Sequence, residues 1–154
     1  MVEILAGVST RGPVPFFPLK PAPRFVIVLA ACVLAAQTTR SVWDGVYTSE
    51  QAERGAALYA NNCASCHGSA LGGGESAPPL TGGEFSSNWN GLTVGDLFER
   101  IRISMPADRP GKLSREQDAD VLAYMLNVSE FPAGKSELEH QTEVLKQIRI
   151  EAKP

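Results

Sequence analysis

The chain has 154 residues, enough for one domain of ordinary size together with a leader segment. Its composition is ordinary for a soluble protein, with 44% hydrophobic residues, 20% charged residues and a formal net charge of −3. No run of basic residues is present, which argues against nucleic acid as a partner.

Residues 1–40 are predicted to be a leader rather than part of the fold. Twelve consecutive apolar residues, 25–36, follow two basic residues. Such a run is too short to span a bilayer, and basic residues in front of it are typical of a signal peptide. We therefore expect export to the periplasm, with cleavage after Ala36 or a few residues later before Trp43, and no transmembrane span in the mature form.

The same stretch contains a second cleavage pattern. The residues Leu-Ala-Ala-Cys at 29–32 resemble a lipoprotein box, and cutting there would leave Cys32 as a lipidated N-terminus. The apolar run continues past Cys32, which disfavours this alternative. A lipid anchor at Cys32 remains open.

The first predicted helix begins at a capping-box pattern, Thr48-Ser49-Glu50-Gln51, and runs to the cysteines that follow. It contains Gly55, although glycine inside a helix is unfavourable by about 1 kcal/mol relative to alanine. A second helix crossing closely at Gly55 would explain why a side chain is missing there.

The first helix leads into Cys63-Ala64-Ser65-Cys66-His67, the spacing of a c-type haem attachment site. On a helix Cys63 and His67 share a face, with Cys66 beside them. The two sulfurs can then form thioethers with haem vinyl groups while the imidazole ligates the iron. We predict one covalently bound haem c, with Cys63 and Cys66 attaching it and His67 as an iron ligand.

Two other functions use similar cysteine spacings. A thioredoxin-like CxxC motif is found in a βαβ context, and the surrounding sequence does not indicate one. A zinc site needs a second pair of ligands, whereas the other cysteine, Cys32, is in the leader and His140 is isolated.

Residues 68–92 are predicted to be a loop, because glycines and prolines recur along them. A loop of this length inside a domain usually has a function, and this one could wrap the haem. A second helix is expected from the cap residue Thr93 to about Ser104, before Pro106. A third begins at another capping box, at Ser114.

Three helices and almost no strand signal predict an all-α domain over residues 41–130. Residues 131–154 are predicted to be a C-terminal strap or a solvated tail. We favour the strap, because its apolar residues would otherwise be exposed: Phe131, Leu145, Ile148 and Ile150.

Over about residues 46–128 the chain resembles a class I, mono-haem cytochrome c. In that family a Pro-x-Leu loop and a distal Met-Pro follow the haem histidine, as Pro78-Pro79-Leu80 and Met105-Pro106 do here. Gly55 and Tyr59 match the family's glycine and aromatic residue on the first helix. The resemblance implies a cytochrome c fold, in which three main helices and long loops surround the haem.

The second iron ligand is expected to be Met105. It follows His67 by thirty-eight residues, ends a helix and precedes Pro106, and the resemblance places it over the iron. Met125 and His140 are the competitors, but the first lies mid-helix among core residues and the second stands alone in the tail.

The remaining predicted site residues surround the haem. The carbonyl of Pro78 is expected to accept a hydrogen bond from Nδ1–H of His67. Candidate members of the apolar wall are Tyr59, Leu80, Leu97 and Ile101. Candidate contacts of the haem propionates are Trp89 and either Arg100 or Arg102.

Several segments also resemble small cytochromes encoded with, or fused to, quinoprotein (PQQ-dependent) alcohol dehydrogenases: WDGVYT, LFERIRISMP, PGKLS, ADVLAYML and FPAG. This resemblance implies a periplasmic dehydrogenase as electron donor. The expected acceptor is a respiratory oxidase or another cytochrome.

No separate catalytic constellation is present in the sequence. We therefore expect a one-electron carrier that is not an enzyme by itself. Two alternatives remain open: a tightly bound cytochrome subunit of a quinoprotein dehydrogenase complex, and a gas-binding or peroxidase-like haem protein in which Met105 leaves the iron easily.

Overall fold

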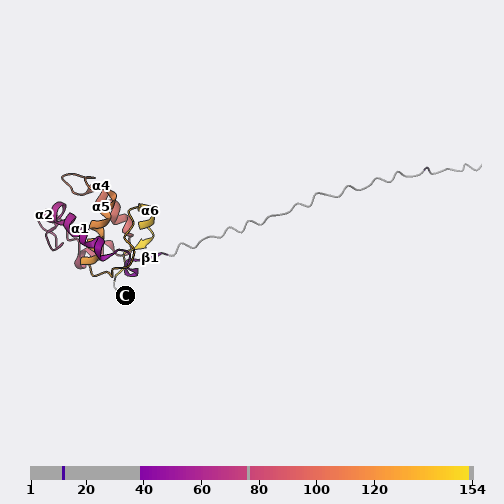
Figure 1. The fold of residues 1–154 in the computed structure, drawn as a ribbon, viewed down its shortest axis with the longest axis horizontal. Helices are drawn as coiled ribbons and strands as arrows, with labels where there is room; N and C mark the ends of the chain where they lie inside the picture. Colours follow the sequence, from indigo (N-terminus) through magenta and orange to yellow (C-terminus); the bar gives the residue numbers. More distant parts are fainter. Residues whose placement is uncertain (1–11, 13–38, 76, 153–154) are drawn as a thin grey trace, which may run out of the picture. The chain divides into compact units, whose positions relative to one another are not determined.

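The computed structural model describes residues 12, 39–75 and 77–152. The predicted leader, with Cys32, therefore lies almost entirely outside the described residues. The described elements all belong to the unit Ala35–Pro154, and they are, in chain order, β1 (Arg40–Ser41), η1 (Val42–Asp44), α1 (Ser49–Asn62), α2 (Ala64–His67), α3 (Gly82–Trp89), α4 (Val94–Ser104), α5 (Arg115–Val128), α6 (Thr142–Leu145) and β2 (Ile148–Arg149). This part of the chain is mostly helical, which confirms the predicted all-α class (Figure 1).

Helices α1 and α5 cross in contact at Gly55, as the glycine predicted. A Cβ atom added to Gly55 would lie 1.9 Å from the carbonyl oxygen of Asp120. Beside the crossing, the rings of Tyr59 and Tyr124 pack with their centroids 5.4 Å apart. Arg54 bonds the Asp120 carboxylate at 2.9 Å, so the same pair of helices is also joined at the surface.

The cap predicted at Thr93 and the capping box predicted at Ser114 are both present, each as a complete capping box, and they start α4 and α5. The prediction for residues 68–92 was wrong in one part, because Gly82–Trp89 form α3. Two glycines at its start lower the intrinsic helix propensity. Burial of Phe85, which is 3% exposed, offsets that cost.

The capping box predicted at Thr48 is only half formed. The Thr48 side chain accepts a hydrogen bond from the backbone N–H of Gln51. The Gln51 side chain instead bonds the backbone of Leu138, donating to its carbonyl oxygen at 3.0 Å and accepting from its N–H at 2.6 Å. A buried amide on α1 thus fixes a residue far along the chain.

Residues beyond α5 pack against the helices as a strap. Four of its apolar side chains are at most 3% exposed: Leu138, Leu145, Ile148 and Ile150. Strand β2 pairs in parallel with β1, so the strap also meets the start of the described domain. Figure 1 shows α6 and β1 on the same side of the helix cluster.

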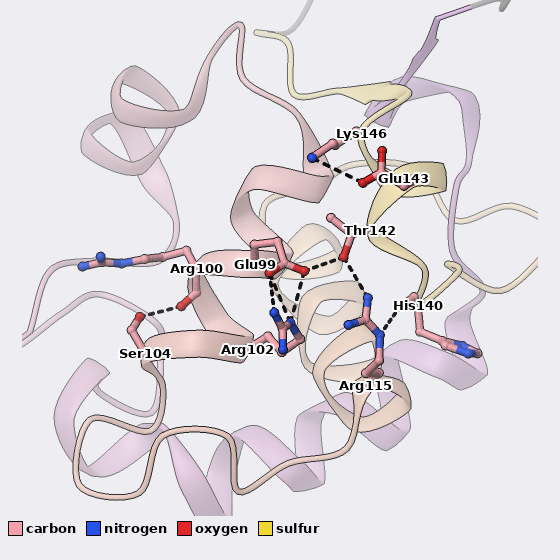
Figure 2. A network of polar contacts seen from close by, with 9 residues as sticks. All are labelled: Glu99, Arg100, Arg102, Ser104, Arg115, His140, Thr142, Glu143 and Lys146. Atoms are coloured by element: carbon pink, nitrogen blue, oxygen red, sulfur yellow. Dashed lines mark hydrogen bonds and ion pairs between the residues drawn. The ribbon is translucent and has the colours of Figure 1, made fainter.

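A polar network ties the strap to α4 and α5 (Figure 2). Arg115 donates to the carbonyl oxygen of His140 at 2.9 Å and to the hydroxyl of Thr142 at 2.8 Å. The Thr142 hydroxyl in turn donates to Glu99, which also accepts from Arg102. Each of these polar groups therefore has a partner on another element or on its own helix.

Replacing Gln51 with leucine is expected to lower the free energy of unfolding by about 2–4 kcal/mol. Each buried backbone group left without a partner costs about 1–3 kcal/mol, and the N–H and C=O of Leu138 would both lose theirs. Urea denaturation measures this change. The control is Gln141→Leu, at an exposed glutamine of the same strap, expected to stay within about 0.5 kcal/mol of the wild type. Equal stability of the two variants would contradict the role given to Gln51.

Candidate haem-binding site

A cavity of about 870 Å³ lies between the α1–α2 junction, residues 77–80 and helices α3, α4 and α5. This volume is within the range of about 300–1,000 Å³ that is usual for cofactor and ligand sites. Eight of the nine predicted site residues line the cavity: Cys63, Cys66, His67, Pro78, Leu80, Leu97, Ile101 and Met105. Residues far apart in the sequence are therefore brought to one place, as the haem hypothesis requires.

His67 is buried at the end of α2 and is held by the loop that follows it. Its side chain is oriented by a hydrogen bond between Nδ1 and the carbonyl oxygen of Pro78, at 2.8 Å, as predicted. Because a carbonyl oxygen can only accept, Nδ1 carries the hydrogen. The other ring nitrogen, Nε2, is then unprotonated in the neutral imidazole and can ligate a metal.

Cys63 separates α1 from α2, so the predicted single helix is broken there. Its backbone, at φ −124° and ψ −34°, leaves the helical region, and its carbonyl oxygen accepts from the N–H groups of Cys66 and His67. One short turn thus brings both cysteines and the histidine to the cavity. Neither Cys63 nor Cys66 is in a disulfide.

The environment of Cys63 does not resemble that of a reactive dithiol. Burial raises the pKa of the Cys63 thiol to about 11, and the charges of Asp118 and Cys66 add to the effect. Redox-active CxxC motifs instead have a thiol with a lowered pKa. The thioredoxin-like alternative therefore has no support from the chemistry of this thiol.

Met105 lies at the end of α4 and lines the cavity. Its backbone N–H closes the last turn by donating to the carbonyl of Ile101 at 2.8 Å, and the residue after it, Pro106, is buried and also lines the cavity. Of the two competitors, Met125 on α5 lines the cavity as well. His140 does not, and its Nε2 lies 3.5 Å from Glu116.

Tyr59 does not line the cavity, unlike the other predicted wall residues. It is 2% exposed and packs on Tyr124, and its hydroxyl donates to the carbonyl oxygen of Gly68 at 2.6 Å. Tyr59 therefore fastens the segment after His67 to α1, which makes it a positioning residue for the haem-attachment turn.

Helix α3 supplies wall residues that were not predicted, notably Phe85 and Trp89. These side chains are four positions apart, a helical spacing that could have revealed them. Trp89 was expected only as a propionate contact. Other apolar lining residues that the sequence reasoning missed are Leu92, Val121 and Met125.

Arginine side chains on α4 point to different places. Arg100 lines the cavity, whereas Arg102 pairs with Glu99 at 2.7 Å and does not line it. Figure 2 shows the Arg100 side chain directed away from the cluster around Glu99. Of the two arginines considered for the propionates, only Arg100 is placed to reach an anionic group in the cavity.

The family comparison covers the same part of the chain. Residues 50–125 match the family model described as cytochrome c oxidase, cbb3-type, subunit III, and this range holds the haem-attachment motif and Met105. Residues 50–125 are therefore similar in sequence to a cytochrome c domain. Together with the mostly helical structure, this match confirms the predicted cytochrome c fold.

Among solved structures, the crystal structure of the sulfane dehydrogenase SoxCD from Paracoccus pantotrophus is similar at 24% sequence identity and a TM-score of 0.48. The similarity covers 70% of this chain and 61% of that one, so this chain spans about three fifths of the length of the chain it matches. No curated protein matches the sequence. Over residues 39–75 and 77–152, no helix is both long and apolar enough to cross a membrane.

Proposed function

We propose that the protein is a periplasmic one-electron carrier with a single haem c, attached through Cys63 and Cys66 and ligated by His67 and Met105. The observation that carries this proposal is the meeting of the attachment turn and Met105 in one cavity of about 870 Å³. When bound, the haem supplies a reversible one-electron couple, and a thioether ligand favours Fe(II) relative to a second histidine.

The protein side chains give this site the properties of a carrier. The hydrogen bond to Pro78 fixes the tautomer and orientation of His67, so the imidazole is ready to bind iron. His67 and Met105 together would hold the iron and leave no position for an exchangeable ligand, which suits electron transfer better than ligand exchange. The apolar lining, which includes Leu80, Leu97 and Ile101, excludes water and favours the less charged, reduced state.

The partners proposed are a periplasmic dehydrogenase as donor and a respiratory oxidase or another cytochrome as acceptor. The resemblance of several segments to cytochromes of quinoprotein alcohol dehydrogenases supports a PQQ-dependent donor. Cytochrome c domains are typical of proteins that act outside the cytoplasm, which supports the proposed export.

The start of the described domain favours the earlier of the two cleavage sites. Arg40 and Ser41 pair with the strap, and Val42 is fully buried in the core. Cleavage before Trp43 would remove all three residues. Cleavage after Ala36 retains them, and the mature chain would begin at Gln37.

The intact mass of the exported protein tests the proposal. We expect the mass of residues 37–154 plus one haem, and a pigment that acid–acetone treatment does not extract. A variant with both Cys63→Ala and Cys66→Ala is the matched control, and any haem it holds should be extracted. Extraction of the pigment from the wild type, or an exported protein without haem, would overturn the proposed function.

A further inference from the structure

Asp118 is a buried carboxyl group that the proposed electron-carrier site does not use. It lies in the first turn of α5 and is 1% exposed. Neither of its carboxyl oxygens has a hydrogen-bond partner among the described residues. Burying an acid without partners is costly, and such groups in native proteins usually have a specific reason.

The ionisable groups that act on Asp118 come from two helices: Glu99 and Arg102 on α4, and Arg115 on α5. The charge of Asp118 in turn acts on the thiol of Cys63, between α1 and α2. Both arginines donate their hydrogen bonds elsewhere, Arg102 to Glu99 and Arg115 to the strap (Figure 2). Their charges therefore act on Asp118 without direct contacts to its oxygens.

Asp118 and Glu99 respond to this cluster in opposite ways. Hydrogen bonds from Arg102 and Thr142 hold the pKa of Glu99 down, to about 2. Burial raises the pKa of Asp118 to about 6, against the opposing pull of Arg102 and Arg115. Within the cluster, Asp118 is the carboxyl group that can exchange a proton near neutral pH, while Glu99 stays ionised.

Asp118 is also close to the cavity wall, although it does not line the cavity. Val121 and Met125, one and two turns further along α5, both line it. The charge of Asp118 also raises the pKa of the Cys63 thiol in the haem-free chain, so Asp118 lies near the cavity-lining side chain that would join the haem. Because interactions between charges are stronger away from water, a change of charge in the cavity should change the proton affinity of Asp118.

We propose that Asp118 is a redox-linked proton acceptor, which binds one proton when the haem site gains an electron and releases it on oxidation. This inference rests on the proposed function. The electron comes from a one-electron donor, such as a reduced dehydrogenase or a redox mediator. The proton comes from water and forms an O–H bond on the Asp118 carboxylate, so the net charge of the site is conserved.

The direction of the coupling follows from the charges. The oxidised site carries one more positive charge, which favours the Asp118 carboxylate, and the reduced site favours the neutral acid. The midpoint potential should therefore fall as the pH rises through a range around 6. If the acid dissociation constant of Asp118 is tenfold larger in the oxidised protein than in the reduced protein, the midpoint potential should fall by about 59 mV across that range.

The test is a titration of the midpoint potential against pH, with the wild type, Asp118→Asn and Asp120→Asn. We expect Asp118→Asn to have, at every pH, the high midpoint potential that the wild type has at low pH. Its midpoint potential should not fall as the pH rises. Asp120→Asn is the matched control, because it makes the same substitution on the same helix at a carboxylate paired with Arg54. It should keep the wild-type pH profile.

Two results would overturn the inference: a wild-type potential that does not change over this pH range, or the same fall in Asp118→Asn. Reduced-minus-oxidised infrared spectra of the wild type and Asp120→Asn provide a test that does not need the Asp118 variant to fold. A protonated-carboxyl band that appears on reduction and shifts with labelled aspartate is expected, and its absence also overturns the inference. A protein that binds no haem would instead contradict the proposed function, because no couple could then be titrated.

Discussion

Replacing Gly55 with alanine is expected to lower the free energy of unfolding by about 3 kcal/mol or more. The new Cβ atom would lie 1.9 Å from the carbonyl oxygen of Asp120, 2.5 Å from its carbonyl carbon and 3.0 Å from Cβ of Tyr124. Backbone atoms cannot rotate away as the end of a flexible side chain can. Helices α1 and α5 must therefore separate, which outweighs the gain of about 1 kcal/mol in helix propensity. Urea denaturation of the haem-loaded protein measures the loss.

The control for this substitution is Gly83→Ala in α3. A Cβ atom added to Gly83 would have no neighbour within 4 Å, so the only expected effect is the higher helix propensity of alanine. We expect this variant to be unchanged or stabilised by up to about 1 kcal/mol. If Gly55→Ala unfolds at the same urea concentration as the wild type, close contact between the helices is not the reason for glycine at this position.

Features that depend on neighbours in the chain could be predicted from the sequence. The cap predicted at Thr93 and the capping box predicted at Ser114 were correct, because each joins residues three positions apart. The hydrogen bond from His67 to Pro78 was also predicted, with the help of a family resemblance that supplied the loop geometry. Gly55 is informative for a different reason, since a residue that is unfavourable in a helix points to a tertiary contact.

Features decided by distant partners could not be predicted in the same way. Gln51 has the correct spacing for a capping box, but the backbone of Leu138 competes for its side chain and binds it. Tyr59 has a suitable side chain for a haem wall, but Gly68 and Tyr124 hold it outside the cavity. For Arg100 and Arg102 the sequence offered no basis for a choice, because the choice depends on the pairing of Arg102 with Glu99.

The environment of Asp118, a charged residue, also depends on distant parts of the chain and could not be predicted from its neighbours in the sequence. It lies two positions from Asp120, on the same helix, and nothing in the local sequence distinguishes the two. The structure pairs Asp120 with Arg54 near the surface and buries Asp118 without a partner. The difference depends on which face of α5 its neighbouring helices cover, so it becomes visible only when the helices are packed together.

Replacing Met105 with alanine is expected to change the spectrum of the haem protein more than any other substitution outside the attachment motif. If Met105 is the sixth ligand, its loss should convert the oxidised protein from low spin to high spin and let the reduced protein bind carbon monoxide. The midpoint potential should fall by on the order of 100 mV, since axial ligands set haem potentials over a range of about 0.8 V. Absorption spectra of both oxidation states and a redox titration measure these changes.

The control is Met125→Leu, because Met125 is the second methionine that lines the cavity. Leucine conserves most of its volume in the core of α5, so the fold should lose less than about 1.5 kcal/mol. The low-spin spectrum should remain, because a core methionine contributes packing and not a ligand. The opposite pattern, with low-spin spectra retained in Met105→Ala and lost in Met125→Leu, would transfer the ligand role to α5. The site would then use the same cavity with its thioether on a different helix, and the electron-carrier proposal would survive with a different iron ligand.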